Sequence, residues 1–232
     1  MKYKITVGVL SLGLATLAWA AGPKDDNSAD SELQRATETV QHITSADPDK
    51  GVPKDVLDRA KCVAVIPKLV KGAFVIGGEH GDGVASCKTS NGMWSSPAPF
   101  AVSGISWGPQ IGGKSSDLMM FVMNDEGMND LMRGHIKLGA DVSAAAGPVG
   151  RSASVDAGYK AGILTYSTSK GAFIGASLNG AEIQQDNKAT EAWYGKKVPF
   201  SDILKGDVKS NNPDAQAFVN AVQNTKETAQ AR

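Results

Sequence analysis

The sequence predicts an α+β fold, in which a Gly-rich, curled antiparallel β-sheet, closing towards a barrel, carries helices contributed by the N- and C-terminal parts of the chain. Three observations support this prediction. Helical periodicity is found near the two ends and in one short segment between them, and apolar runs of strand length fill the centre. These runs follow one another too closely for the helical crossovers that a parallel sheet requires.

The first twenty residues have the pattern of a signal peptide. A basic start precedes an apolar run over 5–17, and Ala18 and Ala20 are small residues at the positions that a signal peptidase reads. The run is shorter than the ~20 apolar residues that span a bilayer. We therefore expect residues 1–20 to be removed on export, which leaves a periplasmic chain, soluble or peripherally membrane-associated. A retained N-terminal anchor is the alternative.

The elements of the remaining chain are predicted in order. Residues 21–31 are small, polar and charged, which indicates a flexible start of the mature chain. Residues 32–228 are expected to form a single domain. Within it, apolar residues at helical spacing predict a helix over 31–45, and Pro53 suits the first position of a second, short helix.

Strands dominate the centre. Residues 62–66 read as a buried strand that Pro67 is expected to end, because proline lacks the N–H that a sheet requires. Strands over 73–76 and 83–87 are expected to be joined by a hairpin turn in the Gly- and Asp-rich segment 77–82. Further strands are predicted over 117–123 and near 138–146, 154–168 and 171–183, and further helices over 125–133, 188–194, 200–204 and from Pro213, with Asn212 as its cap.

The charges argue against a nucleic-acid partner. Lys plus Arg and Asp plus Glu number 24 each, so the chain has no bulk positive charge. Basic residues are nevertheless concentrated between Lys50 and Lys71, where they predict a surface for anionic lipid head groups. An ordinary solvated surface is the alternative. The candidate lipid-contacting residues are Lys54, Arg59, Lys61, Lys68 and Lys71.

Cys62 and Cys87 are the two cysteines of the chain. Cys62 begins one apolar strand-like run and Cys87 ends another, so the two could lie side by side. Export would place them in an oxidising compartment, which favours a disulfide; two buried free thiols are the alternative. The three histidines show no ligand spacing with either cysteine, and we expect neither a metal nor another cofactor.

Two catalytic signatures overlap in one Gly-rich stretch. Residues 108–115 match the phosphate-binding loop, but that loop opens a helix, whereas a strand is expected here, and Pro109 removes one amide. Residues 104–108 match the elbow that presents a nucleophilic serine, here Ser106. That elbow requires a parallel sheet and a distant later histidine, and His135 is too near in the chain. We therefore expect no enzymatic activity.

A series of short motifs runs through almost the whole predicted domain, roughly residues 33–225. In chain order the principal motifs are AKCVAVIP at 60–67, KGAFVIGG at 71–78, WSSP at 94–97, GPQIG at 108–112, KLGAD at 137–141, AGPVGR at 146–151 and SKGAFIGASL at 169–178. In this order they resemble the SYLF family of lipid-binding domains. The resemblance implies phospholipid binding without catalysis, through a basic N-terminal region in eukaryotic members, some of which also bind actin.

We expect a non-enzymatic domain of the cell envelope that recognises anionic phospholipid, or another envelope lipid, at a membrane surface. The first helix carries Glu and Thr rather than strong basic charge, and an exported chain would meet neither actin nor abundant phosphoinositides. The resemblance therefore carries over the lipid class and not a specific lipid. The alternative is a structural or adaptor protein of the envelope that binds a protein partner.

Overall fold

The computed structural model describes residues 29–45, 51–73, 76–107, 112–149, 161–169, 172–175, 178 and 180–230. The predicted signal peptide, residues 21–28 of the predicted flexible start and residues 154–160 of a predicted strand lie outside the described residues.

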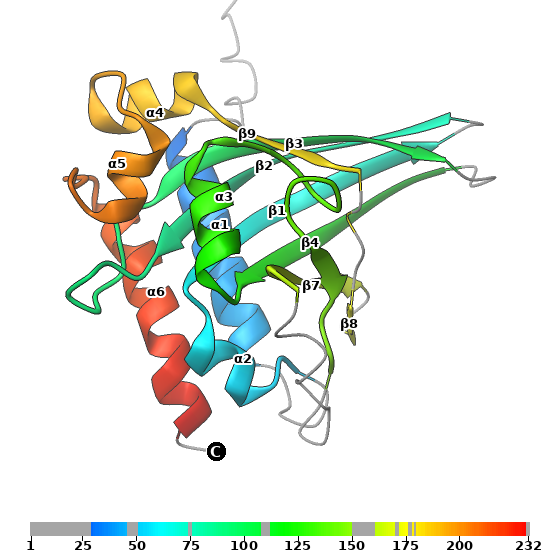
Figure 1. Cartoon of the computed structure of the whole chain (residues 1–232), viewed down its shortest axis with the longest axis horizontal. Helices are drawn as coiled ribbons and strands as arrows, with labels where there is room; N and C mark the ends of the chain where they lie inside the picture. Colours follow the sequence, from blue (N-terminus) through cyan, green and yellow to red (C-terminus); the bar gives the residue numbers. More distant parts are fainter. Residues whose placement is uncertain are drawn as a thin grey trace, which may run out of the picture.

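Helices lie mainly at the two ends of the chain and strands in its centre, as predicted (Figure 1). The helices are α1 (Ala29–Thr44), α2 (Lys54–Arg59), α3 (Asp125–Met132), α4 (Asn187–Tyr194), α5 (Phe200–Lys205) and α6 (Pro213–Gln230). The strands are β1 (Cys62–Ala73), β2 (Ile76–Cys87), β3 (Ala98–Trp107), β4 (Gly112–Val122), β5 (His135–Lys137), β6 (Ala144–Ala146), β7 (Ile163–Ser169), β8 (Ala172–Gly175) and β9 (Glu182–Gln185).

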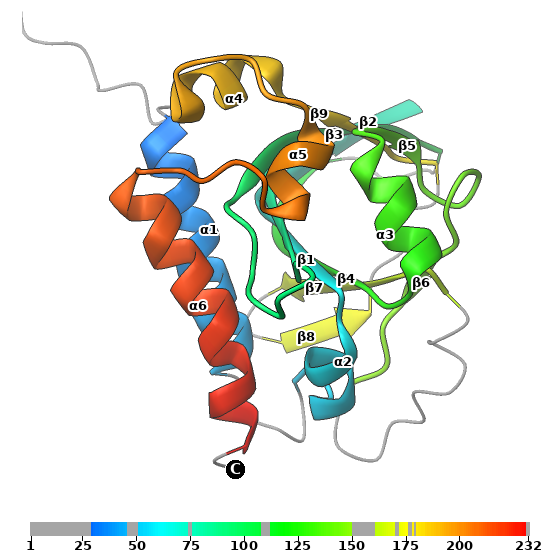
Figure 2. The same ribbon diagram turned by 60° about the vertical axis from the view of Figure 1, so that its left-hand side comes forward.

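The described strands form one curled, nine-stranded sheet in the order β5-β9-β3-β2-β1-β4-β7-β6, with β8 paired to β7 (Figure 2). All of these pairs are antiparallel except β6 with β7, which is parallel. The predicted α+β class with a curled sheet is confirmed. The strand predicted near 138–146 is replaced by two short ones, β5 and β6, on opposite edges of the sheet.

Each face of the sheet has its own apolar core. Successive residues of a strand point to opposite faces, so β1 sends Ala64 to one core and Val65 to the other. We call the side covered by α1, α2 and α6 the α1 face, and the side covered by α3 and α5 the α3 face. Phe121 and Phe218 are fully buried on the α1 face, and Phe100 is fully buried on the α3 face.

Helices α1 and α6 lie side by side with their N-termini together (Figure 2). Asn212 Nδ2 donates to Asp30 Oδ1 at 2.9 Å, and Gln34 Nε2 donates to Asp214 Oδ2 at 3.3 Å. Asp214 N–H in turn donates to Asn212 Oδ1 at 2.8 Å, in the capping position predicted for Asn212. The first and last helices of the domain therefore share one layer on the α1 face.

Pro67 does not end β1, so this part of the prediction is wrong. The register of β1 with β4 shifts between Ile66 and Leu69, and in this irregularity Lys68 has a φ of 65°. The N–H of Lys68 donates to the side chain of Asp117 in β4, at 3.2 Å from Oδ1, rather than to a backbone carbonyl of that strand. A bulge accommodates a proline because it interrupts the ladder of hydrogen bonds. The strand therefore continues to Ala73.

The segment 77–82, predicted as a hairpin turn, is part of β2 and pairs with β3 throughout. Gly81 in this segment, and Gly83 directly after it, serve close packing instead of a turn. A Cβ on Gly81 would lie 2.7 Å from Ile66 Cγ2, and one on Gly83 would lie 2.9 Å from Ile66 Cγ1. Glycine inside a strand marks such a close approach as often as it marks a turn.

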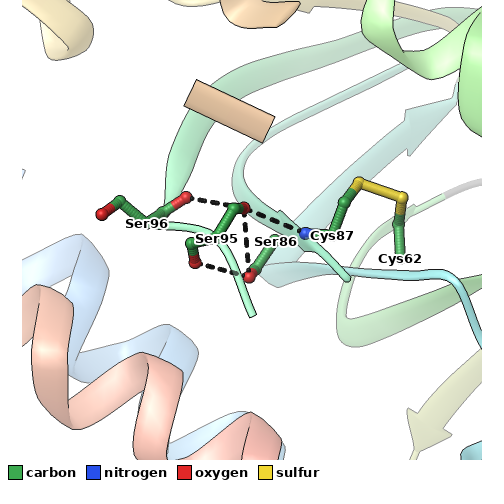
Figure 3. The surroundings of a disulfide bond; sticks show 5 residues. All are labelled: Cys62, Ser86, Cys87, Ser95 and Ser96. Carbon is green, nitrogen blue, oxygen red and sulfur yellow. Dashed lines mark hydrogen bonds between the residues drawn. A yellow bond between two sulfur atoms is a disulfide. The ribbon is translucent and has the colours of Figure 1, made fainter. Parts of the chain in front are cut away.

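Cys62 and Cys87 lie directly opposite each other in β1 and β2 and are joined by a disulfide (Figure 3). Both are fully buried. Beside them, Ser86 Oγ donates to the Ser95 carbonyl at 2.7 Å, and the N–H of Cys87 donates to Ser95 Oγ at 3.1 Å. The start of β1, the end of β2 and the loop that follows β2 are thus fixed at one point.

Candidate functional site

The four central strands extend beyond the helices. Strands β1 to β4 have 10 to 12 residues each, and Figure 1 shows their ends running past the helical layers. On the α1 face the buried apolar residues of β1 and β2 end at Val65 and Val84. Beyond this point the residues on the same face are exposed. We call this surface the distal platform; it consists of Val70, Gly72, Gly78, His80, Ser103 and Ser115.

The distal platform is made of two rows that cross the strands. The first row runs across β4, β1, β2 and β3 as Ser115, Val70, His80 and Ser103. In the second row Gly72 lies between Gly113 and Gly78. A Cβ on Gly72 would meet nothing within 4 Å, and one on Gly78 would meet only the Gly104 carbonyl oxygen, at 3.9 Å. The surface is therefore open at these two positions.

Val70 gives the distal platform an apolar centre. Val70 is 45% exposed, and among the residues whose exposure the structure describes the only other exposed large apolar residue is Met93. His80 Nε2 lies 3.9 Å from Asp82 Oδ1, so the charge next to the platform is partly balanced when His80 is protonated. An apolar centre with a polar, weakly charged surround suits contact with a protein better than contact with a highly charged polymer.

An ion pair closes the other face of the same strand ends. Lys71 Nζ lies 2.7 Å from Glu79 Oε2, and the Glu79 side chain is only 7% exposed. A Cβ on Gly104 would lie 2.7 Å from Glu79 Oε1, so the glycine provides the space that the carboxylate occupies. A buried carboxylate without a partner is costly, and Lys71 supplies the partner here. This ion pair helps to hold the strand ends beneath the distal platform.

The predicted lipid-contacting residues do not lie together. Lys54, Arg59 and Lys61 lie in or next to α2, where β1 begins, whereas Lys71 lies near the other end of β1. At about 3.3 Å per residue, roughly 30 Å of strand separates Lys61 from Lys71. The cluster seen in the sequence is therefore spread along the molecule, with Lys68 in the bulge between its two ends.

Two of these five residues are held by carboxylates. Lys61 Nζ lies 2.6 Å from Asp125 Oδ1, and Lys71 pairs with Glu79. Lys54, Arg59 and Lys68 are exposed. A role of any of the five in lipid binding stays a prediction.

The two catalytic signatures lie in strands as far as the structure describes them. Ser106 is in β3, opposite Gly77, and the last four residues of the loop-like motif, 112–115, open β4. A phosphate-binding loop and a nucleophile elbow both require a following helix. In the described ranges no group of three or more His, Cys, Asp or Glu residues is placed to bind a metal ion, and no helix is sufficiently long and apolar to span a membrane.

The comparison with known families decides the classification. The sequence model of the family described as "Ysc84: Las17-binding protein actin regulator" matches residues 103–225, from β3 to α6. The chain belongs to this family. It is the SYLF family that the ordered motifs resemble, so that prediction is confirmed.

Curated proteins from yeast and mammals are similar to this chain. LAS seventeen-binding protein 3 of Saccharomyces cerevisiae is 35% identical over 166 residues, which cover 69% of this chain and 36% of the relative. Protein YSC84 of the same yeast is 33% identical over 191 residues, with 78% and 41% coverage. SH3 domain-containing YSC84-like protein 1 of Homo sapiens is 28% identical over 184 residues, with 76% and 54% coverage. The chain thus spans about half of these relatives or less.

The names of the Ysc84 family and of its yeast relative refer to binding and to actin regulation, and not to an enzymatic reaction.

Val70 and Glu79 were not among the candidate functional residues predicted from the sequence. The signal for Glu79 is the two-residue period of β2, because Glu79 has the same parity as Gly81, Gly83 and Ala85 and therefore faces the interior. Reading 77–82 as a turn concealed that period.

Proposed function

We propose that the chain is a non-catalytic adaptor domain that binds a protein partner through the distal platform. The observation that carries this proposal is the exposed Val70 beside open glycines at a sheet end that no described helix covers. The description of the Ysc84 family and the name of LAS seventeen-binding protein 3 support a role in protein binding. A partner that binds the distal platform must present a surface that fits its apolar centre and polar surround.

The physical properties of the distal platform favour protein recognition. Protein interfaces have an apolar centre and a polar rim, and Val70 is flanked by His80 and Ser115 in its row. Glycine and serine side chains lose little rotamer freedom when a partner covers them. The backbone beneath is already fixed by pairing across four strands and by the ion pair of Lys71 with Glu79. Binding therefore requires little ordering of the platform.

Site-specific photo-crosslinking in the native cell tests this proposal. A photoreactive phenylalanine analogue at position 70 is expected to capture a defined protein, whereas the same analogue at Glu191, exposed on α4, is expected to yield no such adduct. With the captured protein in purified form, Val70→Asp should weaken binding by about tenfold or more, as expected for a residue at the centre of an interface.

Glu191→Lys is the control, because it reverses a charge at an exposed site remote in sequence from the platform. It should leave both affinity and thermal unfolding unchanged. Adducts to lipid alone at position 70, or equal weakening by Val70→Asp and Glu191→Lys, would contradict the protein-binding proposal.

An anionic membrane surface is the second candidate function. The resemblance to lipid-binding domains and the exposure of Lys54, Arg59 and Lys68 favour it. Replacing these three by Gln should weaken the free energy of binding to phosphatidylglycerol vesicles by up to ~3 kcal/mol at low salt, since each basic residue contributes on the order of 1 kcal/mol. The loss should be smaller near physiological salt, because salt screens the attraction. Co-sedimentation with the vesicles measures the binding. Lys61 and Lys71 stay in place, so that Asp125 and Glu79 keep their partners.

The matched control for the lipid experiment replaces Lys188, Lys196 and Lys197 by Gln, which removes the same charge from three exposed positions in and after α4. This variant should sediment like the unmodified protein. Equal loss by the two triple variants, or binding of neutral and anionic vesicles alike at low salt, would argue against a specific basic surface.

We also propose that the chain is exported, because residues 1–20 have the pattern of a signal peptide. A disulfide between Cys62 and Cys87 suits the oxidising compartment that export would supply.

A further inference from the structure

Glu32 is a half-buried residue, and one of its carboxyl oxygens is fully buried without a hydrogen bond where α1 meets its neighbours. It lies in the first turn of α1, directly before the fully buried Leu33. Its Oε1 atom is buried and has no hydrogen-bond partner among the described residues. The helix contacts β2, α4 and α6 in this region of the fold. A carboxylate in such a place would lose its hydration without gaining a donor.

The charged groups that act on Glu32 are mainly acidic. Asp82 of β2 and Asp186, the N-cap of α4, oppose its ionisation, and Arg35 of α1 favours it. Burial first, and then these two carboxylates, raise the pKa of Glu32 to about 8. Two further groups lie around this cluster: His80, 3.9 Å from Asp82, and Asp214 of α6, which accepts from Gln34 of α1.

We propose that Glu32 is a proton-dependent latch, which holds the first turn of α1 on β2 and α4 when its carboxyl is protonated and releases that turn when it ionises. The released carboxylate reaches water and moves away from Asp82 and Asp186. The rest of α1 stays in place, because Ala36, Val40 and Ile43 remain buried in the core of the α1 face. This device is independent of any partner of the distal platform.

The direction of the pH dependence follows from the two states. The closed turn keeps its proton up to about pH 8, whereas the open turn has an ordinary carboxyl that loses its proton near pH 4.5. Closure is therefore strongest below pH 4.5 and weakens as the pH rises. Between these two values the opening equilibrium should grow about tenfold per pH unit, and it should level off above them.

Hydrogen exchange of the full chain tests the latch. After correction for intrinsic rates, the protection of the Leu33 and Gln34 amides is expected to fall about tenfold per pH unit between roughly pH 5 and 7.5 and to level off above about pH 8. Glu32→Gln keeps the shape of the side chain but cannot ionise, so its protection should be independent of pH. Glu38→Gln, at an exposed position of the same helix, should behave like the unmodified protein.

A second measurement uses the unmodified protein and therefore does not depend on the folding of Glu32→Gln. Carbon-13 NMR of the Glu32 carboxyl in the unmodified protein should show a titration midpoint near 8. A midpoint near 4.5, or protection of the first turn that does not change with pH in the unmodified protein, would overturn the latch. The same pH dependence in Glu32→Gln would also overturn it.

Discussion

Replacement of Gly83 by alanine is expected to destabilise the fold by about 3 kcal/mol, the upper end of the usual cost of overpacking a core. The new Cβ would lie 2.6 Å from Phe100 Cζ, 2.8 Å from the Val65 carbonyl oxygen and 2.9 Å from Ile66 Cγ1. All three neighbours are buried in the sheet, and one is a backbone atom of the paired strand β1. The strands cannot separate at this point without loss of packing on both faces.

Thermal unfolding measures this effect, and a chain of this size should lose roughly 6 to 12 °C in its midpoint. Gly72→Ala is the matched control in the neighbouring strand, where a Cβ meets nothing within 4 Å. It should leave the midpoint unchanged or raise it slightly, since alanine restricts the unfolded chain. An unchanged midpoint for Gly83→Ala, or an equal loss in the two variants, would contradict the packing described for β2.

Removal of the disulfide by the double change Cys62→Ala and Cys87→Ala is expected to lower the free energy of unfolding by about 3 kcal/mol. The bond closes a loop with a sequence separation of 25, and without it the unfolded chain gains conformational freedom. Urea titration with and without reductant measures the loss. Reductant should lower the unfolding midpoint of the unmodified protein towards that of the double variant and leave the variant unchanged.

Intact-mass measurement of the protein recovered from cells reports on the disulfide and on export together. The expected mass is that of the oxidised chain beginning at Ala21. A chain that retains Met1 would contradict the predicted processing. A reduced mass, or an unmodified protein whose stability ignores reductant, would contradict a stabilising bond between Cys62 and Cys87.

Local patterns predicted much of the fold. The helical spacing of Leu33, Ala36 and Val40 predicted α1, and these residues are fully buried on the sheet. Helix α3 lies where predicted, and the predicted cap Asn212 binds the first turn of α6. Such features depend on residues within one or two turns of each other, and sequence displays them directly.

The errors come from features that depend on distant residues. Pro67 was expected to end a strand because sequence does not show the bulge that β4 makes possible through Asp117. Gly81 was interpreted as part of a turn because its close neighbour, Ile66, lies on another strand. In both cases the local residue types were recognised, but the contacting residue on another strand, which determines the local structure, cannot be identified from the sequence.

The candidate site was the least predictable part. Val70 is exposed only because the helices of the α1 face do not reach the ends of the four long strands, and this follows from the relative lengths of packed elements. The basic residues between Lys54 and Lys71 form a cluster in the sequence, but an extended strand separates Lys61 from Lys71 by its length. Residues that are close in the sequence can therefore lie far apart in space when the segment between them is an extended strand.

The pairing of α1 with α6 also determines when the fold can be completed. Gln34 and Asp214 are 180 residues apart in the chain, so their contact belongs to the slowest class of folding events, those with large loop-closure entropy. While the chain is being synthesised, the apolar stripe of α1 lacks its main helical neighbour until α6 has been made. The nascent polypeptide therefore stays short of its native topology until α6 emerges, which would suit the export proposed above, in which a chain is threaded through a membrane before it folds.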